Sequence, residues 1–354
     1  MAFSPPSCTT SPLPVVPEEL FVQIVALLSS YAHNRCFTPQ AITRLKSLGD
    51  YHEVIDIGRR ETDNALVADA IKNADILVTG WGTPRLTADI LAAAKQLKLI
   101  AYAAGSVSFI DIAAWKRGIT VTNVMPIMAM GVAEFTVTCI LSGLRRFDAL
   151  LNPAKFDANP FFSVPKVGFM LRGKTVGMVG LGIIGRQTLD LLRPFGCNFQ
   201  VYDPFINEQA IRALGATKVD LESLMSTSDI VSLHAPGTKK TEHIINEPML
   251  RRLKPGAILV NTARGILIDN DALVAVAKEG KIGVYLDVTR PERLPDDHPL
   301  RHMNNVVITP HIAGPTVEGW PMMGDACVDE VERYIKGEPV KYPVLEHQYE
   351  NQST

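Results

Sequence analysis

Gly180-Leu-Gly-Ile-Ile-Gly185 lies in the middle of this 354-residue chain and decides its fold. Residues 175–179, just before it, are predicted to form a buried strand, and residues 186–193 carry apolar side chains at helical spacing. A strand, a glycine turn and a helix are the context of a dinucleotide-binding fingerprint. The first glycine permits the tight turn, Gly182 lets the backbone approach a pyrophosphate, and the last glycine allows helix and strand to pack closely.

The segments that follow the turn also fit a dinucleotide. The helix begins near Ile183 and Ile184, and the N–H groups of its first turn suit an anion such as pyrophosphate. A second predicted strand, residues 199–202, is followed by Asp203, about 20 residues beyond the fingerprint, where an acid meets the ribose hydroxyls. Because a carboxylate repels a 2′-phosphate, NAD is predicted rather than NADP. The alternative is an ordinary glycine-rich turn in another doubly wound domain.

Length and composition restrict the class of protein. The chain is long enough for two domains with cores, and its 37 acidic and 35 basic residues nearly balance. We therefore expect neither nucleic acid nor an anionic membrane as a partner. No apolar stretch is expected to reach the length of a membrane-spanning helix. Five scattered cysteines lack metal-ligand spacing, so no metal is expected and a reducing, cytoplasmic setting is favoured. Cys139 and Cys197 are predicted to be buried.

The position of the fingerprint predicts two doubly wound α/β domains, because half of the chain precedes it. Strands are predicted at 75–79, 97–102, 230–233, 257–260, 282–286 and 305–308, and helices at 38–48, 87–96, 131–146 and 316–336. We predict a disordered tail (1–17), a flavodoxin-like substrate domain (18–128 and 326–354) and a Rossmann domain for NAD (129–325) inserted into it. A cleft is expected between the two domains.

Three polar residues follow predicted strands of the second domain, at the edge where such sheets bind ligands. Hydride transfer to a carbonyl needs a cation to polarise the oxygen and a donor for the hydroxyl proton. Arg264 suits the first role because a guanidinium forks onto a carboxylate or 2-oxo acid. His311 suits the second, and Glu292 is placed to fix its tautomer. The alternatives are a surface arginine and a solvated glutamate.

From about residue 75 to 340 the chain resembles the D-isomer-specific 2-hydroxyacid dehydrogenase family. Besides the fingerprint and Asp203, the matching motifs are Ala104-Gly-Ser-Val107, Asn123-Val-Met-Pro126, Val132-Ala-Glu134, Leu233-His-Ala-Pro236 with Thr238 and Thr241, Leu253-Lys-Pro-Gly256, Asn261-Thr-Ala-Arg-Gly265, Leu286-Asp-Val288 and Thr309-Pro-His311. The resemblance implies NADH-dependent reduction of a 2-oxo acid by an Arg–Glu–His triad that matches Arg264, Glu292 and His311. It also implies a homodimer built around the long helix near Glu134.

The resemblance and the fingerprint together assign the remaining site residues. Those expected to bind the cofactor are Gly180, Gly182, Ile183, Ile184, Gly185, Asp203, His234, Ala235, Pro236, Thr241, Thr262, Ala263, Asp287 and Gly314. Asp287 is implied to hold the nicotinamide carboxamide. For His234, the alternative to a contact with the cofactor is a structural role. The backbone around Gly105, Ser106 and Val107 is implied to bind the substrate carboxylate. The chain departs from the family pattern at Tyr285, Thr289 and Arg293, which puts the loop geometry near Glu292 in doubt.

The substrate side chain and the alternative functions are less constrained. Trp81 follows a first-domain strand and is expected to approach the cleft, where Met125, Met128, Met130, Trp320, Met322 and Met323 form either an apolar wall or ordinary core packing. A wall favours bulky or apolar 2-oxo acids over phosphorylated ones. The alternatives are an NAD-sensing corepressor or scaffold and a formate- or phosphite-type dehydrogenase. Formate enzymes lack the Glu–His pairing that Glu292 offers, whereas phosphite enzymes share the trio.

Overall fold

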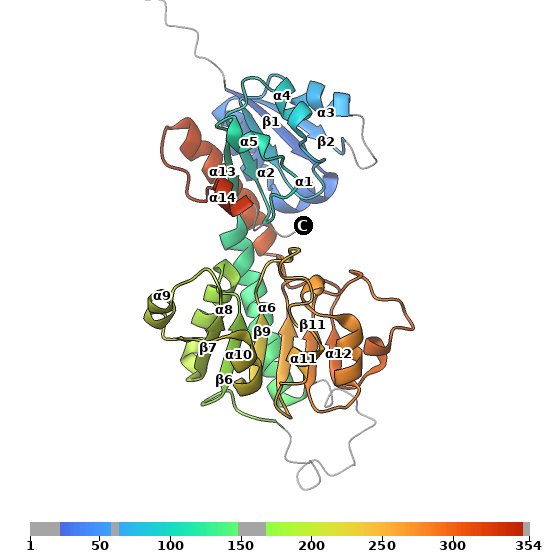
Figure 1. The fold of residues 1–354 in the computed structure, drawn as a ribbon. Helices are drawn as coiled ribbons and strands as arrows, with labels where there is room; N and C mark the ends of the chain where they lie inside the picture. Colours follow the sequence, from blue (N-terminus) through green and yellow to red (C-terminus); the bar gives the residue numbers. More distant parts are fainter. Residues whose placement is uncertain (1–21, 58–63, 148–167, 350–354) are drawn as a thin grey trace, which may run out of the picture.

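The protein is described from a computed structural model, which covers residues 22–57, 64–147 and 168–349. Two units of parallel sheet and helices lie one above the other, and a long helix runs between them (Figure 1). This arrangement confirms the prediction of two doubly wound α/β units. The predicted tail, residues 1–17, lies outside the described residues, and the exact domain boundaries stay a prediction.

The first sheet has five parallel strands in the order β2-β1-β3-β4-β5. They are β1 (Gln23–Leu28), β2 (Asp50–Ile55), β3 (Ile76–Thr79), β4 (Leu99–Tyr102) and β5 (Thr120–Asn123). Helices α1 (Ser30–Cys36), α2 (Pro39–Leu48), α3 (Asn64–Ile71), α4 (Ala88–Ala93) and α5 (Ala113–Lys116) accompany them. This strand order is that of flavodoxin, and its direction reverses between β1 and β3.

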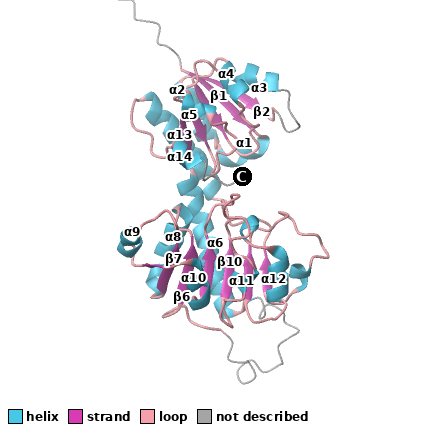
Figure 2. Cartoon of the chain, in the orientation of Figure 1, coloured by secondary structure: helices cyan, strands magenta, loops and turns pink. Residues whose placement is uncertain are grey.

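The second sheet has seven parallel strands in the order β12-β11-β10-β9-β6-β7-β8 (Figure 2). They are β6 (Thr175–Val179), β7 (Asn198–Tyr202), β8 (Thr217–Lys218), β9 (Ile230–Leu233), β10 (Ile258–Asn261), β11 (Gly283–Leu286) and β12 (Val306–Ile308). The helices are α8 (Ile183–Leu192), α9 (Glu208–Ala213), α10 (Leu221–Thr227), α11 (Glu247–Leu250) and α12 (Asn270–Ala277). The order is Rossmann-like and reverses between β6 and β9, so the fingerprint turn lies at a topological switch point.

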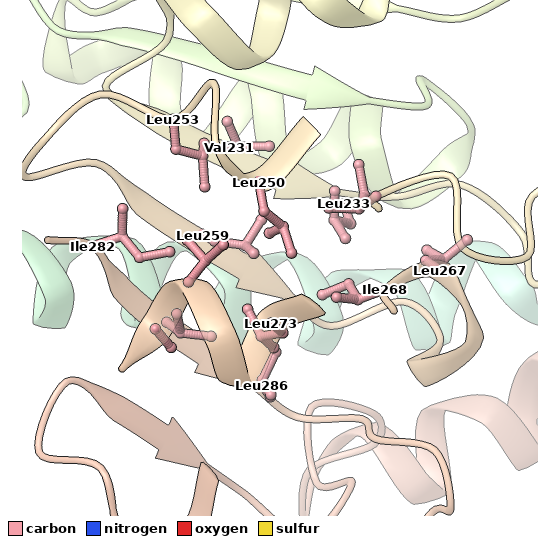
Figure 3. Packing of buried hydrophobic residues seen from close by; sticks show 14 of the residues in the cluster. Val231, Leu233, Leu250, Leu253, Leu259, Leu267, Ile268, Leu273, Ile282 and Leu286 are labelled. Atoms are coloured by element: carbon pink, nitrogen blue, oxygen red, sulfur yellow. The ribbon is translucent and has the colours of Figure 1, made fainter. Parts of the chain in front are cut away.

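Fully buried strands explain the continuous apolar runs of the second half. Leu233 and Leu259 from the sheet pack with Leu250 of α11 and Leu273 of α12, all at most 1% exposed (Figure 3). A parallel sheet covered on both faces buries both sides of each strand. The core therefore holds the carboxyl ends of these strands in fixed positions, and the loops that follow them inherit that rigidity.

Helices α6 (Met125–Arg145) and α13 (Gly319–Ile335) connect the two units. Helix α6 contacts α8, β10 and β11 of the second unit and also α13, which packs against α1, α2, β4 and β5 of the first. The expectation that no stretch reaches membrane-spanning length is wrong. Helix α6 has 21 residues and contains an 18-residue stretch with a mean hydropathy of 1.7, so by length and composition alone it is long and apolar enough. Its apolar residues instead include Val132, Ile140 and Leu144, which are buried between these elements.

Two smaller features complete the first unit. Residues 341–344 run beside the edge strand β5, where Pro343 bridges Thr122 in antiparallel fashion and the Val344 N–H donates to the Val121 carbonyl at 2.8 Å. Cys36 and Cys327 are buried in the core between α1, α13 and the sheet. Cys139 and Cys197 are only partly buried, so the prediction for them was wrong, because they lie at the margin of a core cluster rather than within it.

Candidate functional site

The fingerprint turn has the geometry that its glycines predict. Gly180 has φ +93°, and a Cβ there would lie 2.8 Å from the Ala235 nitrogen. A Cβ on Gly185 would lie 2.8 Å from the Gly180 carbonyl oxygen, so helix and turn pack without room for a side chain. No atom lies within 4 Å of a Cβ built on Gly182, the N-cap of α8, and no side chain caps the helix there. The helix N-terminus is therefore open to an anion.

The carboxylate of Asp203 holds this turn through hydrogen bonds. One oxygen of its buried carboxylate accepts the Leu181 N–H at 2.9 Å, and the other accepts the N–H groups of Phe205 and Ile206 at 2.9 and 3.2 Å. The carboxylate thus ties the end of β7 to the glycine turn after β6. A carboxylate at this place is a hydrogen-bond acceptor for ribose hydroxyls and a repulsive neighbour for a 2′-phosphate.

A cavity of about 310 Å³ opens at the carboxyl ends of β6, β9 and β10. It brings together most of the residues predicted to meet cofactor and substrate. The predicted residues that line it are Ser106, Gly182, Ile183, Ile184, His234, Ala235, Pro236, Thr262, Ala263 and Arg264, and Met125 lines it as well. Ser106 and Met125 come from the first unit and from the start of α6. The cavity therefore lies between the two units, as the predicted cleft required.

His234 lies in this cavity as a neutral imidazole. Burial lowers its pKa to about 4. Its Nε2 lies 2.9 Å from the Ser232 hydroxyl, whereas its buried Nδ1 has no hydrogen-bond partner among the described residues. An orphaned buried nitrogen, an uncapped helix N-terminus and the open space at Gly182 are features that a bound dinucleotide would satisfy. The residues present therefore fit the predicted NAD.

Arg264 supplies the positive charge of the cavity. It follows β10 and lies largely buried, and burial lowers its pKa while Glu292 opposes that shift. Its Nη1 donates to the Ala263 carbonyl at 2.7 Å. The side-chain amide of Asn261 donates to the backbone carbonyl of Arg264 at 3.0 Å. These bonds hold the loop after β10 in one conformation. A guanidinium with remaining donors in a partly desolvated cavity is suited to a carboxylate or a keto oxygen.

His311 and Glu292 form a hydrogen-bonded pair. The Nδ1 atom of His311 contacts Oε1 of Glu292, and both residues line a second cavity of about 620 Å³ together with Thr289 and Arg293. Because Nδ1 is engaged, Nε2 is the nitrogen left for exchange of a proton with another group. The departures at Thr289 and Arg293 have not displaced Glu292: the Thr289 hydroxyl donates to the carbonyls of Pro291 and Glu292 at 2.8 and 3.0 Å.

Asp287 holds the loop that carries His311. Its carboxylate accepts the Thr309 hydroxyl at 2.6 Å and the backbone N–H groups of Ile312 and Ala313 at 2.9 Å each. The family resemblance implied a contact with nicotinamide, and the sequence did not indicate this role. The missed signal is the spacing of a buried Asp after β11 and a Thr-Pro-His turn after the neighbouring β12, which brings both to one sheet edge.

Several of the remaining predicted residues do not line this cavity. The Thr241 hydroxyl donates to the Pro236 carbonyl at 2.6 Å and so shapes the loop after β9. Val107 is buried in the first core, and the Gly105 carbonyl accepts a hydrogen bond from the Asn123 amide at 2.6 Å. Trp81 stacks edge-on against Trp320, with ring centroids 5.0 Å apart.

The methionines predicted as a substrate wall separate into different environments. Met125 lines the cavity, and Met128 packs beside it, since the methyl groups of both approach Gly105. Met323 is fully buried in the first core, so for that residue the core alternative holds. Met130 and Met322 are exposed.

Helix α6 touches the loops of both units. Its Met125 lies beside the Ser106 loop. A Cβ on Gly131 would lie 2.6 Å from the carbonyl of Gly314, in the segment after His311. The hydroxyls of Thr136 and Thr262 hydrogen-bond at 2.7 Å. Helix α6 therefore supports the Ser106 loop, the loop before Arg264 and the segment after His311.

Comparison with known proteins identifies a family. Residues 138–313 match the family model described as the NAD-binding domain of D-isomer-specific 2-hydroxyacid dehydrogenases. A glyoxylate reductase from Thermofilum pendens is 41% identical over 266 residues, which cover 72% of this chain and 77% of that protein. A D-3-phosphoglycerate dehydrogenase from Methanocaldococcus jannaschii is 36% identical over 304 residues. That match covers 84% of this chain and 56% of the relative, so the chain spans just over half of that protein's length.

A solved structure extends the match to both units. The NAD-dependent formate dehydrogenase from Staphylococcus aureus, determined in complex with NAD, is 29% identical and has a TM-score of 0.66. The alignment covers 92% of this chain and 98% of that chain. An alignment of this extent reaches beyond residues 75–340, the part of the chain that carries the sequence resemblance.

Proposed function

This chain belongs to the D-isomer-specific 2-hydroxyacid dehydrogenase family, and we propose that it reduces a 2-oxo acid to a D-2-hydroxy acid. As a member of the family it is an NAD-dependent oxidoreductase that acts on CH–OH groups. In our proposal Arg264 and His311 are the catalytic residues, and Glu292 positions His311. The observation that carries it is the His311–Glu292 pair at the same sheet edge as the cavity that contains Arg264 and the fingerprint.

The cofactor, when bound, supplies the hydride. The uncapped N-terminus of α8 and the Asp203 carboxylate would hold its pyrophosphate and ribose, and His234 would offer Nδ1 to it. The side chain of Asp287 already accepts three hydrogen bonds, so we propose that its contribution to cofactor binding is made while it also holds the 309–313 loop.

Arg264 binds the substrate and polarises it. Its guanidinium holds the 2-oxo acid by the carboxylate and places positive charge next to the keto oxygen, where negative charge grows as the carbonyl is reduced. The backbone at Ser106 and its neighbours completes the carboxylate site, since Ser106 lines the same cavity. Partial burial of Arg264 strengthens both interactions because little water competes with them.

His311 supplies the proton for the new hydroxyl group from Nε2. Glu292 holds Nδ1, which fixes the orientation of the ring and leaves Nε2 for the transfer of the proton. In the reverse direction the same nitrogen removes the hydroxyl proton. The two residues act as a unit, so loss of either one impairs the same step.

The test is NADH oxidation against a panel of 2-oxo acids, with formate and phosphite assayed in the oxidative direction. His311→Ala should lower kcat by about two to four orders of magnitude and leave NADH affinity nearly unchanged. Glu292→Gln, which keeps the size of the side chain, should lower kcat by about 10- to 100-fold. Wild-type turnover in His311→Ala would refute the proposed role. Tight NADH binding with no turnover of any compound would instead favour a corepressor or scaffold.

We propose that the chain forms a homodimer along α6. Glu134 and Thr138 are exposed on this helix, whose other face is buried between the two units. Sedimentation of the purified protein tests the proposal, and a monomer at micromolar concentration would refute it.

A further inference from the structure

Four side chains from three segments of the chain meet at the carboxyl edge of the first sheet. Tyr31 and Arg35 lie one turn apart on α1, Trp81 follows β3, and Trp320 begins α13. The ring of Trp320 packs edge-on against Trp81 at 5.0 Å and against Tyr31 at 5.5 Å. The guanidinium carbon of Arg35 lies 4.0 Å from the centre of the Tyr31 ring and 5.9 Å from that of Trp320. We call Tyr31, Trp81 and Trp320 the aromatic cluster.

The aromatic cluster lies where an open sheet binds ligands. The order of the first sheet reverses between β1 and β3, and the segments that follow these two strands carry Tyr31 and Trp81. The Ser29 hydroxyl donates to the Trp81 carbonyl and joins the two segments. In doubly wound sheets the crevice beyond such a reversal is the preferred ligand site. The second sheet has the fingerprint at its own reversal, and the reversal of the first sheet marks a second place where this rule predicts a ligand.

The aromatic cluster lies at the same edge of the first sheet as the Ser106 loop, which lines the cavity. Strand β4, next to β3, leads into the loop with Ser106, which lines the cavity together with Arg264. The Cys36 thiol at the end of α1 lies 3.9 Å from the Ala103 carbonyl, just before that loop. Trp81 and Met128 pack against the same hydrophobic core cluster. A substrate held by its carboxylate at Ser106 would therefore direct its side chain toward the aromatic cluster.

Arg35 is the charged group at the outer end of this wall. In the part of the chain that the structure describes, this exposed side chain forms no ion pair with a carboxylate, and its guanidinium lies over the rings of Tyr31 and Trp320. Stacking occupies the face of a guanidinium and leaves the N–H donors in its plane for an acceptor. One fork of donors matches one carboxylate.

We propose that the preferred substrate is a 2-oxo acid with a second carboxylate, which Arg35 binds while the aromatic cluster lines the chain between the two acidic groups. This inference rests on the proposed function and specifies its substrate class. It refines the expectation of an apolar wall, because among the described residues the aromatic cluster ends at Arg35, a cation that no carboxylate pairs with. It favours dicarboxylates over phosphorylated 2-oxo acids, since one guanidinium balances the single negative charge of a carboxylate but leaves part of the larger charge of a phosphate monoester uncompensated.

The experiment compares two substrates that differ only in the distal charge. In 5-methyl-2-oxohexanoate two methyl groups replace the distal carboxylate oxygens of 2-oxoglutarate. Wild-type kcat/KM should be at least about 10-fold higher for 2-oxoglutarate, and Arg35→Gln should lower that ratio by about 10- to 100-fold, mainly through KM. Arg35→Lys, which keeps the charge but not the fork, should fall in between. The ratio cancels any general loss of activity from local unfolding.

Lys46→Gln is the matched control. Lys46, near the end of α2, also lies over a ring at 5.8 Å, but that ring belongs to Tyr51 at the start of β2 and thus lies at the opposite edge of the sheet. It should leave the substrate ratio unchanged. An equal ratio in wild type and Arg35→Gln overturns the inference, as does a preference for phosphohydroxypyruvate. Glyoxylate, which has no side chain, separates the two proposals: turnover of glyoxylate with no dicarboxylate preference overturns only this inference, and no turnover of any 2-oxo acid overturns both.

Discussion

The backbone N–H of His311 donates to the carbonyl of Asp287 at 3.0 Å, while His311 itself has φ +56°. A residue other than glycine rarely adopts this left-handed conformation, and it persists only where surrounding contacts impose it. The Asp287 carboxylate supplies those contacts through Thr309, Ile312 and Ala313. Asp287, which follows β11, thus sets the orientation of His311, which follows the neighbouring strand β12.

Asp287→Asn should therefore impair the reaction through His311. The amide retains one acceptor but turns its NH₂ group toward a backbone N–H, so the 309–313 loop loses at least one bond. We expect kcat to fall by about 10- to 100-fold, because a displacement of about 1 Å is sufficient for such a loss. Thr309→Val removes only the hydroxyl donor and should cost less than Asp287→Asn. Steady-state kinetics of both variants checks this, and unaltered kcat in Asp287→Asn would contradict the positioning role.

Asp203 should determine the choice of cofactor. The wild-type enzyme is expected to have a kcat/KM for NADH that exceeds the value for NADPH by at least about 100-fold, because the carboxylate repels a 2′-phosphate. Asp203→Asn keeps the shape but removes the charge, so the ratio should fall by about 10-fold. Its amide oxygen can still accept the N–H of Leu181 or that of Phe205. A wild-type preference for NADPH would refute the assignment of NAD.

Burial of His234 predicts a loss of stability in acid. Its pKa is about 4 in the folded chain and about 6.5 when unfolded, so the unfolded state binds more protons between these values. Its contribution to stability is therefore complete above pH 6.5 and is lost as the pH falls toward 4, by about 2 to 3 kcal/mol. His234→Gln removes the titration. The free energy of unfolding should show a shallower slope over this range in the variant than in wild type, and parallel slopes would contradict the prediction.

Glu330 should stabilise the carboxyl-terminal segment. This fully buried carboxylate on α13 accepts the backbone N–H groups of Lys341 and Tyr342 at 3.0 and 2.9 Å. Glu330→Ala leaves both donors unpaired and should lower the free energy of unfolding by about 2 to 4 kcal/mol. The control is Glu338→Ala, since Glu338 pairs with Arg333 on the surface and should change stability by less than about 1 kcal/mol. Denaturant titration of the two variants distinguishes them, and equal midpoints would exclude the proposed role of Glu330.

The sequence predicted the second unit more completely than the first. Strands such as Ile258–Asn261 are buried on both faces, so they read as continuous apolar runs with glycine or polar residues at their ends. Strand β2 (Asp50–Ile55) is an edge strand that is largely exposed, and its polar composition does not differ from that of a loop. Strand β8 has two residues and no pattern at all.

For the candidate site, the residues were predictable but several of their contacts were not. Motifs and strand ends place Arg264 and the fingerprint at one edge, and the cavity contains them both. The motifs do not show which groups donate hydrogen bonds to Asp287. Those donors come from a loop 22 to 26 residues later, which reaches Asp287 only because β12 pairs with β11. Arg35 was missed for a similar reason, since its relation to Trp320 exists only in the folded chain.

The contacts of α6 have a consequence for how this enzyme changes over evolutionary time. The helix supports the Ser106 loop, the loop before Arg264 and the segment after His311 through Met125, Thr136 and Gly131. A substitution that shifts this helix would disturb all three at once, so selection should hold it nearly fixed. None of these three contacts involves the segments after β1 and β3. New substrate preferences should therefore arise there, by mutations that leave the chemistry intact.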